Sequence, residues 1–289
     1  MTETQWQLFV DFRKGFKEHC IHWNEAFAAE LEPLQKAAAC KDTPEYPVET
    51  SVVYNHALDE VTADAEIKLI VIGDNPGKDE QRACNQRYLV GQAGKIAEGF
   101  FSRHPELGID FRKNTIILNK TPVHTAKTAH LRYLLKNGGA EITRLIQESQ
   151  LWMAQRTAQL HQALCSAPDC TGGNNAGGDE KKDGAGWAGC QLWLVGYAEL
   201  KGRGLFLDYR DQLAKSYGVQ LAGAGQSDAT SQGFLPEWNQ VMVFQHFSMN
   251  RFTIDLAEKL GKGIISSQLP LQEQLAAVGA LHRQEIFGC

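Results

Sequence analysis

Four short apolar runs are the feature of this 289-residue chain that most constrains its fold. They occupy residues 67–72, 115–118, 191–195 and 240–244, and each is short enough to be a buried β-strand. Segments with helical spacing of apolar residues lie between and after them, at 95–103, 129–135, 142–165, 205–217, 253–260 and 269–287. Strands separated by helices need crossover connections, which place the strands in parallel with helices on both faces. The pattern therefore predicts an α/β fold, a three-layer α/β/α sandwich with a four-stranded, mainly parallel central sheet.

The remaining segments indicate how the chain is organised. Residues 4–38 have helical spacing and predict one or two helices within an N-terminal region, 1–50, that packs on the sheet. Residues 166–189 are rich in Gly, Asn, Asp and Lys, which is typical of a mobile surface insertion. Because strand patterns of the same kind lie on both sides of this insertion, we expect one domain that spans residues 1–289.

Composition narrows the functional classes. No apolar run approaches the ~20 residues that cross a bilayer, and the N-terminus has neither a basic nor an apolar targeting segment. Seven cysteines spread over a long chain fit reduced thiols better than a disulfide framework. We therefore expect a cytoplasmic monomer with no membrane partner. With a net charge of −5 and a pI near 6.0, the chain is not basic, as most nucleic-acid-binding proteins are. An enzyme that contacts only a few phosphates, however, needs only a local positive rim.

Unusual polar residues follow three of the predicted strands. In a parallel sheet the carboxyl ends of the strands share one edge, where ligands of open α/β sheets bind. An acid, two amides and a histidine could therefore converge on one pocket. The three segments are Gly73-Asp74-Asn75-Pro76-Gly77, with Tyr88-Leu89-Val90-Gly91-Gln92-Ala93-Gly94 further on, then Asn119-Lys120-Thr121-Pro122, and finally His246-Phe247-Ser248-Met249-Asn250-Arg251.

These segments resemble motifs of the uracil-DNA glycosylase superfamily. Asn75 stands where the single-strand-selective and mismatch-specific branches carry the asparagine of Gly-x-Asn-Pro-Gly, and Asp74 stands where the family 4 branch carries the acid of Gly-Glu-Ala-Pro-Gly. Residues 90–94 are similar to the Val-Gly-x-Ala-Gly of family 4, and Tyr54-Asn55 is similar to a Tyr-Asn-Pro phrase of the single-strand-selective branch. Asn119 matches the asparagine that reads uracil, and His246 matches the histidine of His-Pro-Ser. The resemblance is collinear over residues 54–252.

The resemblance implies a monofunctional DNA glycosylase that removes uracil or a related deaminated base. Cleavage of an N-glycosidic bond builds positive charge on the sugar and negative charge on the departing base. Asp74 can activate water or stabilise the sugar cation, Asn75 can aim the water, and His246 can donate to the base carbonyl. Asn119 offers a donor and an acceptor that fit uracil and mismatch cytosine.

The same resemblance assigns the binding residues. The base pocket is expected from Gly73, Pro76, Tyr88, Leu89 and Asn119. Such an enzyme must flip the base or act on single strands, and a wedge such as Met249 or Arg251 can fill the gap that the base leaves. The residues expected to contact DNA are Lys120, Ser248, Met249, Asn250 and Arg251.

The chain also departs from the family. Leu89 stands in place of the aromatic ring that stacks on the base, so the stacking ring must be Tyr88, Phe100 or another. Phe247 replaces the proline that follows the histidine. The cysteines do not reproduce the family 4 cluster pattern, so we predict neither an iron–sulfur centre nor any other metal or organic cofactor.

Simpler interpretations stay open at each position. Residues 74–77 make a good turn in their own right, Asn119 can bond a loop backbone, and His246 can be a core histidine. A non-catalytic protein that binds a nucleotide or damaged DNA on the same fold is the alternative function. His161, Cys165, Cys170 and Cys190 supply the ligand types of a structural zinc site, although free thiols are the default for cysteines so spaced.

Overall fold

The computed structural model describes residues 1–43, 45–165, 189–221 and 233–289. Its central feature is a four-stranded sheet in which every pair is parallel and the order is β2-β1-β3-β4. The strands are β1 (Leu69–Gly73), β2 (Thr115–Asn119), β3 (Gln191–Val195) and β4 (Val241–Phe244), and every residue in them is buried. Strands buried on both faces read as continuous apolar runs, which is why the four runs predicted them.

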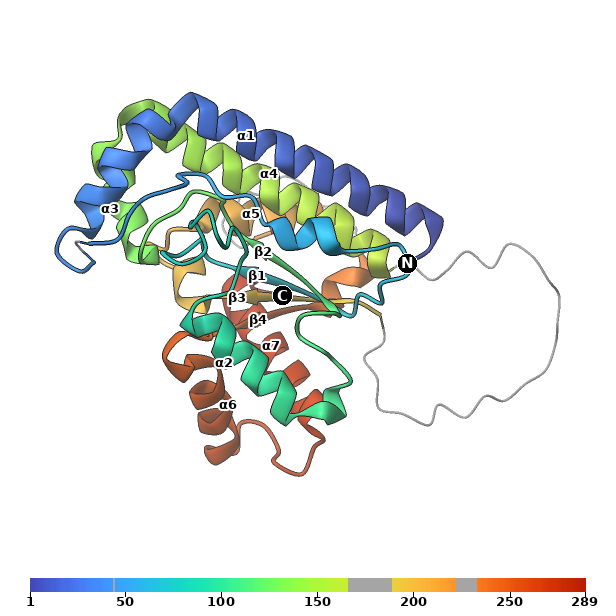
Figure 1. Cartoon of the computed structure of the whole chain (residues 1–289). Coiled ribbons are helices and arrows are strands. Elements are labelled where there is room, and N and C mark those ends of the chain that lie inside the picture. The colour runs from blue at the N-terminus through green and yellow to red at the C-terminus, as the bar shows by residue number, and fades with distance from the viewer. Residues whose placement is uncertain (44, 166–188, 222–232) are drawn as a thin grey trace.

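Helices cover both faces of the sheet and give the three layers seen in Figure 1. On one side lie α1 (Glu3–Ala39) and α4 (Gly139–Cys165), which contact each other, and α5 (Leu207–Ser216), which contacts α4. The short α3 (Leu131–Asn137) packs against α1 and α4. On the other side lie α2 (Gln92–Arg103), α6 (Arg251–Gly261) and α7 (Leu271–Phe287), of which α7 packs on β4. The predicted α/β fold is confirmed.

The N-terminal region is a single helix. Thr2 and Gln5 form a capping box that satisfies the first backbone N–H groups of α1. The helix then runs through Pro33 to Ala39, and a buried face that includes Phe9, Phe16 and Leu31 holds both halves on the same side of the protein. Residues 40–50 are not helical where they are described, so the helical part of the predicted 1–50 region ends at Ala39.

Short 3-10 helices occupy several of the connections. They are η1 (His56–Glu60), η2 (Pro105–Leu107), η3 (Thr128–His130), η4 (Tyr197–Leu200), η5 (Pro236–Gln240) and η6 (Ser248–Asn250). The elements η3, η4 and η6 follow β2, β3 and β4, so they stand at the carboxyl edge of the sheet. The predicted insertion at 166–189 falls, except for Gly189, outside the described residues. Among the helices that the structure describes, none is both long and apolar enough to cross a membrane.

Candidate active site

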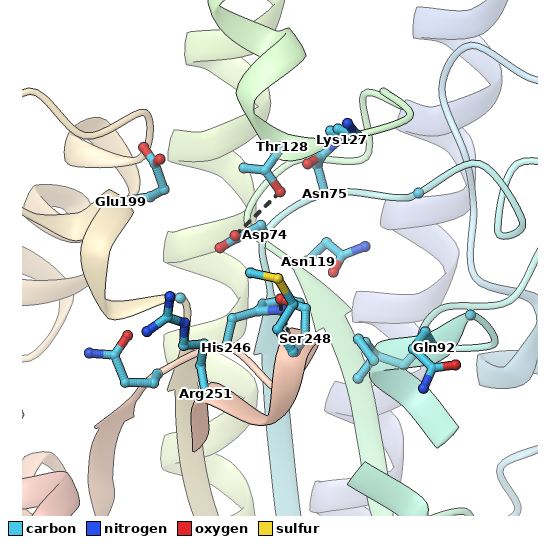
Figure 2. Close-up of a pocket in the computed structure, with 18 of the residues that line it drawn as sticks. Asp74, Asn75, Gln92, Asn119, Lys127, Thr128, Glu199, His246, Ser248 and Arg251 are labelled. Carbon is cyan, nitrogen blue, oxygen red and sulfur yellow. Dashed lines mark hydrogen bonds between the residues drawn. The ribbon is translucent and has the colours of Figure 1, made fainter. Parts of the chain in front are cut away.

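A cavity of ≈ 1090 Å³ opens at the carboxyl edge of the sheet. Its walls come from the turn after β1, the start of α2, the loop after β2, η4 after β3, and the segment from the end of β4 into α6. Asp74, Asn75, Asn119 and His246 all line it, although the first and the last are 172 positions apart in the chain. Figure 2 shows these four side chains around one space. The strand ends that the sequence singled out therefore do meet.

The Asp74 carboxylate lies at the base of the cavity and is 8% exposed. Its Oδ1 accepts a hydrogen bond from Lys120 Nζ at 2.6 Å, and its Oδ2 accepts a long one from Thr128 Oγ1 at 3.4 Å. Gly196, with φ +95°, borders the other side, because a Cβ there would collide with Oδ1. The carboxylate is thus held from three sides.

The prediction that Lys120 contacts DNA is wrong, because its side chain is fully buried. Besides Asp74, its ammonium donates to the carbonyl oxygens of Val195 at 2.5 Å and Gly73 at 3.3 Å. The ring of Phe206 lies 4.9 Å from Nζ, at cation–π distance. Burial lowers the pKa of Lys120, and the neighbouring Asp74 carboxylate opposes that shift.

Asn75 is oriented by the loop that follows β2. Its side-chain NH₂ donates to Val123 O at 3.2 Å and to Thr125 Oγ1 at 2.8 Å, with a third contact to Pro76 O at 3.3 Å. The amide oxygen, Oδ1, is buried and has no hydrogen-bond partner among the described residues. Because the donors are all engaged, the Asn75 side chain can offer only an acceptor to a molecule in the cavity.

Asn119 has an unused hydrogen-bond donor, whereas Asn75 has an unused acceptor. It ends β2 beside Gly73, its register partner on β1, and a Cβ on Gly73 would collide with Asn119 Oδ1. Its Nδ2 is buried without a partner in the described part of the chain. The cavity thus holds an unused amide acceptor at Asn75 and an unused amide donor at Asn119. A buried polar atom without a partner costs stability, so such atoms in a cavity indicate a binding site.

His246 is held as one tautomer by Ser248. The Ser248 backbone N–H donates to His246 Nδ1 at 3.0 Å, and Ser248 Oγ lies 2.7 Å from the same nitrogen. Nδ1 is therefore an acceptor, and the proton of the neutral ring is on Nε2. Burial lowers the pKa of His246, which favours this neutral form. Phe247, which stands in place of the proline of the His-Pro-Ser motif that this segment resembles, is fully buried and packs against Phe252, so it anchors the loop in the core.

The loop of Leu89 borders the cavity. Leu89 has φ +52°, its N–H donates to Glu80 Oε1 at 2.8 Å, and Gly94 is packed so closely that a Cβ there would collide with the Leu89 carbonyl. Tyr88 does not line the cavity; its ring is buried and its hydroxyl donates to Val53 O at 2.6 Å. His246 is the single ring among the described residues of the cavity wall, which includes Leu89 but not Tyr88.

The predicted wedge segment stands at the rim. Met249 and Asn250 adopt φ of +54° and +55° within η6, and Met249 is 72% exposed. Met249, Ser248 and Arg251 line the cavity, whereas Asn250 is exposed outside it. Pro76 is also outside, and its carbonyl accepts from His124 Nδ1 at 2.9 Å, which fixes the turn next to Asn75.

Sequence reasoning missed several residues of this wall. Glu80 is 8% exposed and also accepts a hydrogen bond from Gly77 N–H, and burial raises its pKa to about 7. No motif distinguishes Glu80 from the charged residues around it. The strand-end rule could have found Gly196, which directly follows β3. The described charged residues of the wall are Asp74, Asp79, Glu80, Glu199, Asp255 and Glu258 against Lys78, Lys127 and Arg251.

The possible zinc ligands do not form a site where they are described. His161 Nδ1 lies 2.6 Å from Tyr217 Oη and Nε2 lies 3.1 Å from Cys190 O, while Cys165 Sγ lies 3.3 Å from the same Nε2 and donates to Cys190 O at 3.0 Å. Neither Cys165 nor Cys190 is in a disulfide. Cys170 lies outside the described residues. Within the described parts of the chain, no three His, Cys, Asp or Glu side chains are placed to hold a metal ion.

Comparisons with protein-family models, with curated proteins and with solved structures found no match to this chain.

Proposed function

We propose that the chain is a DNA glycosylase that hydrolyses the N-glycosidic bond of uracil or a related deaminated base, as in base-excision repair. The observation that supports it best is the set of complementary groups in one cavity. A carboxylate, an unused amide acceptor, an unused amide donor and an imidazole Nε2–H are what an N-glycosidic hydrolysis of a pyrimidine needs.

Each group serves one part of the reaction. The Asn75 amide oxygen accepts a hydrogen bond from the attacking water, and the Asp74 carboxylate stabilises the positive charge that grows on the sugar. Asn119 pairs with the edge of the base, and His246 Nε2–H donates to the base carbonyl that becomes negative. The C1′–N bond breaks with its electron pair on the base, and the water oxygen bonds to C1′.

Two residues at the cavity rim can help a base to leave the DNA stack. The base must leave its stack to enter the cavity, at a cost of a few kcal/mol. Met249 is exposed and lies on the rim, so it can enter the vacated space, and Arg251 beside it can contact a phosphate. The proposal includes the cytoplasmic location and the monomeric state expected from the sequence.

A non-catalytic protein that binds a nucleotide or damaged DNA is the second candidate. Two observations favour it, namely the aliphatic Leu89 in the stacking position and the excess of acidic over basic residues on the described cavity wall. An excess of acidic residues is unfavourable for a polyanion.

Turnover and binding measured on one substrate separate the two. A labelled oligonucleotide with one uracil is incubated with the protein, and both its retention and its conversion to an abasic site are followed. Glycosylase activity predicts abasic product that disappears when Asp74→Ala and Asn75→Ala are combined. Retention of the oligonucleotide without product would establish the binding protein instead.

A further inference from the structure

The Lys120–Asp74 ion pair is closed off from the cavity on the lysine side. The three N–H groups of the ammonium have three acceptors, namely Asp74 Oδ1, Val195 O and Gly73 O, and the side chain is fully buried. No donor of Lys120 remains for a substrate. Lys120 can therefore neither bind a phosphate nor attack a sugar, and any effect it has on a reaction must pass through Asp74.

The pair leaves one oxygen of Asp74 for the cavity. Oδ1 accepts the short bond from Lys120, and Gly196 stands against the same oxygen so closely that a Cβ would not fit. Oδ2 has only the long contact to Thr128 at 3.4 Å. In Figure 2 the carboxylate of Asp74 lies between Thr128 and His246. Rotation of the carboxylate would break the ion pair inside a buried environment, which is unfavourable.

We propose that Lys120 is a positioning residue that fixes Asp74 as an oriented anion, with Oδ2 toward the reacting sugar, and that Asp74 acts on the sugar cation rather than as the base for water. This inference rests on the proposed glycosylase function. The charge-assisted hydrogen bond from the Lys120 ammonium and the close approach of Gly196 both fix Oδ1, and the unused amide oxygen of Asn75 supplies the acceptor for water. The attacking water is then held by Asn75, and its proton leaves with the base or to solvent.

A double-mutant cycle with two abasic analogues tests the assignment. Wild type, Lys120→Met, Asp74→Asn and the double variant are compared for kcat and KM on a single-uracil oligonucleotide. The same proteins are titrated with DNA that carries a cationic pyrrolidine or a neutral tetrahydrofuran at the abasic position. The ratio of the pyrrolidine affinity to the tetrahydrofuran affinity measures how well the Asp74 carboxylate interacts with a cation at the sugar position. If Lys120 had a purely structural role, its loss would weaken both affinities and leave their ratio unchanged.

We expect wild type to prefer the pyrrolidine by about tenfold or more, as expected for one well-placed charge interaction. Lys120→Met should lose most of this preference and about 100-fold in kcat, the cost of misplacing a catalytic group by about 1 Å, with KM and tetrahydrofuran affinity nearly unchanged. Because Lys120 acts only through Asp74, the double variant should be no slower than Asp74→Asn alone.

The controls keep the test decisive. Lys113→Met removes an exposed ion pair with Asp110 and should match wild type. If Lys120→Met alone does not fold, the comparison of Asp74→Asn with the double variant still applies, since Lys120 keeps two carbonyl acceptors in Asp74→Asn and the double variant leaves no buried charge unpaired. Wild-type kcat and preference in Lys120→Met, or a double variant much slower than Asp74→Asn, would overturn the assignment. A wild-type protein that releases no base would overturn the proposed function itself, and this inference with it.

Discussion

Gly73→Ala should lower activity while the protein stays folded. Gly73 has no positive φ, so alanine can adopt its backbone conformation without strain. Its Cβ, however, would lie inside 3.0 Å of Asn119 Oδ1, a separation that real Cβ atoms essentially never show. The Asn119 amide is the flexible end of a side chain, so it would move aside by several tenths of an ångström. The change therefore acts on the Asn119 amide, which we propose reads the base, and on little else.

Two opposing contributions set the change in the free energy of unfolding of Gly73→Ala. Moving Asn119 off its preferred rotamer costs about 1 kcal/mol, and replacing glycine by alanine regains about 0.4–1 kcal/mol through the unfolded chain. The free energy of unfolding should then change by about 1 kcal/mol or less, which is a shift in Tm of a few degrees. Losing the Asn119 hydrogen bonds to the base costs about 1–3 kcal/mol, or about 5- to 150-fold in kcat/KM.

The assay is uracil release from a labelled oligonucleotide, with a thermal melt of each protein beside it. Gly261→Ala is the matched control, because a Cβ at Gly261 meets nothing within 4 Å and its φ is not positive. The control should keep wild-type rates. Gly73→Ala with an unchanged kcat/KM would refute the assignment of Asn119 to the base, and a large fall in Tm would refute the steric reasoning.

Three further predictions concern the cavity wall. Gly94→Ala places a Cβ against the Leu89 backbone carbonyl, which cannot turn away, so we expect a loss of about 3 kcal/mol in chemical denaturation. Because burial raises the Glu80 pKa from 4.5 to about 7, the folded state holds the proton more tightly. The stability that Glu80 contributes should therefore fall by about 3 kcal/mol as pH rises from 4.5 to 7, measured as a fall in the free energy of unfolding of wild type relative to that of Glu80→Gln; a difference that stays constant with pH would contradict the shift. Ser248→Ala removes one of two contacts to His246 Nδ1 but keeps the backbone donor, so kcat should fall by about 2- to 10-fold; a loss as large as that of His246→Ala would show that the hydroxyl has a role of its own.

The strands and their carboxyl ends could be predicted from sequence because their signals are local. Continuous apolar runs mark fully buried strands, and a turn directly after such a run lies at the edge where ligands bind. The positions of Asp74 and Asn119 follow from this rule. His246 Nδ1 is held by a residue only two positions away, so its motif already contained the partner.

What the sequence did not reveal depends on contacts between distant segments. The sequence alone predicts a surface position for Lys120. Its burial depends on Val195 O at the end of β3 and on the Phe206 ring just before α5, both of which contact its ammonium. Asn75 is oriented by residues 48 and 50 positions away, Val123 and Thr125. Tyr88 is buried away from the cavity with its hydroxyl on Val53 O, 35 positions earlier in the chain, and Leu89 adopts a positive φ, which no pattern of a leucine predicts.

Base release across a panel of lesions tests the account most directly. Wild-type protein and the Asp74→Ala/Asn75→Ala variant are incubated with single- and double-stranded oligonucleotides that contain uracil, hypoxanthine or xanthine, and the free base is measured. The account predicts that wild type releases at least one of these bases and leaves an abasic site, and that the variant releases none. Absence of base release by wild type from every substrate would contradict it.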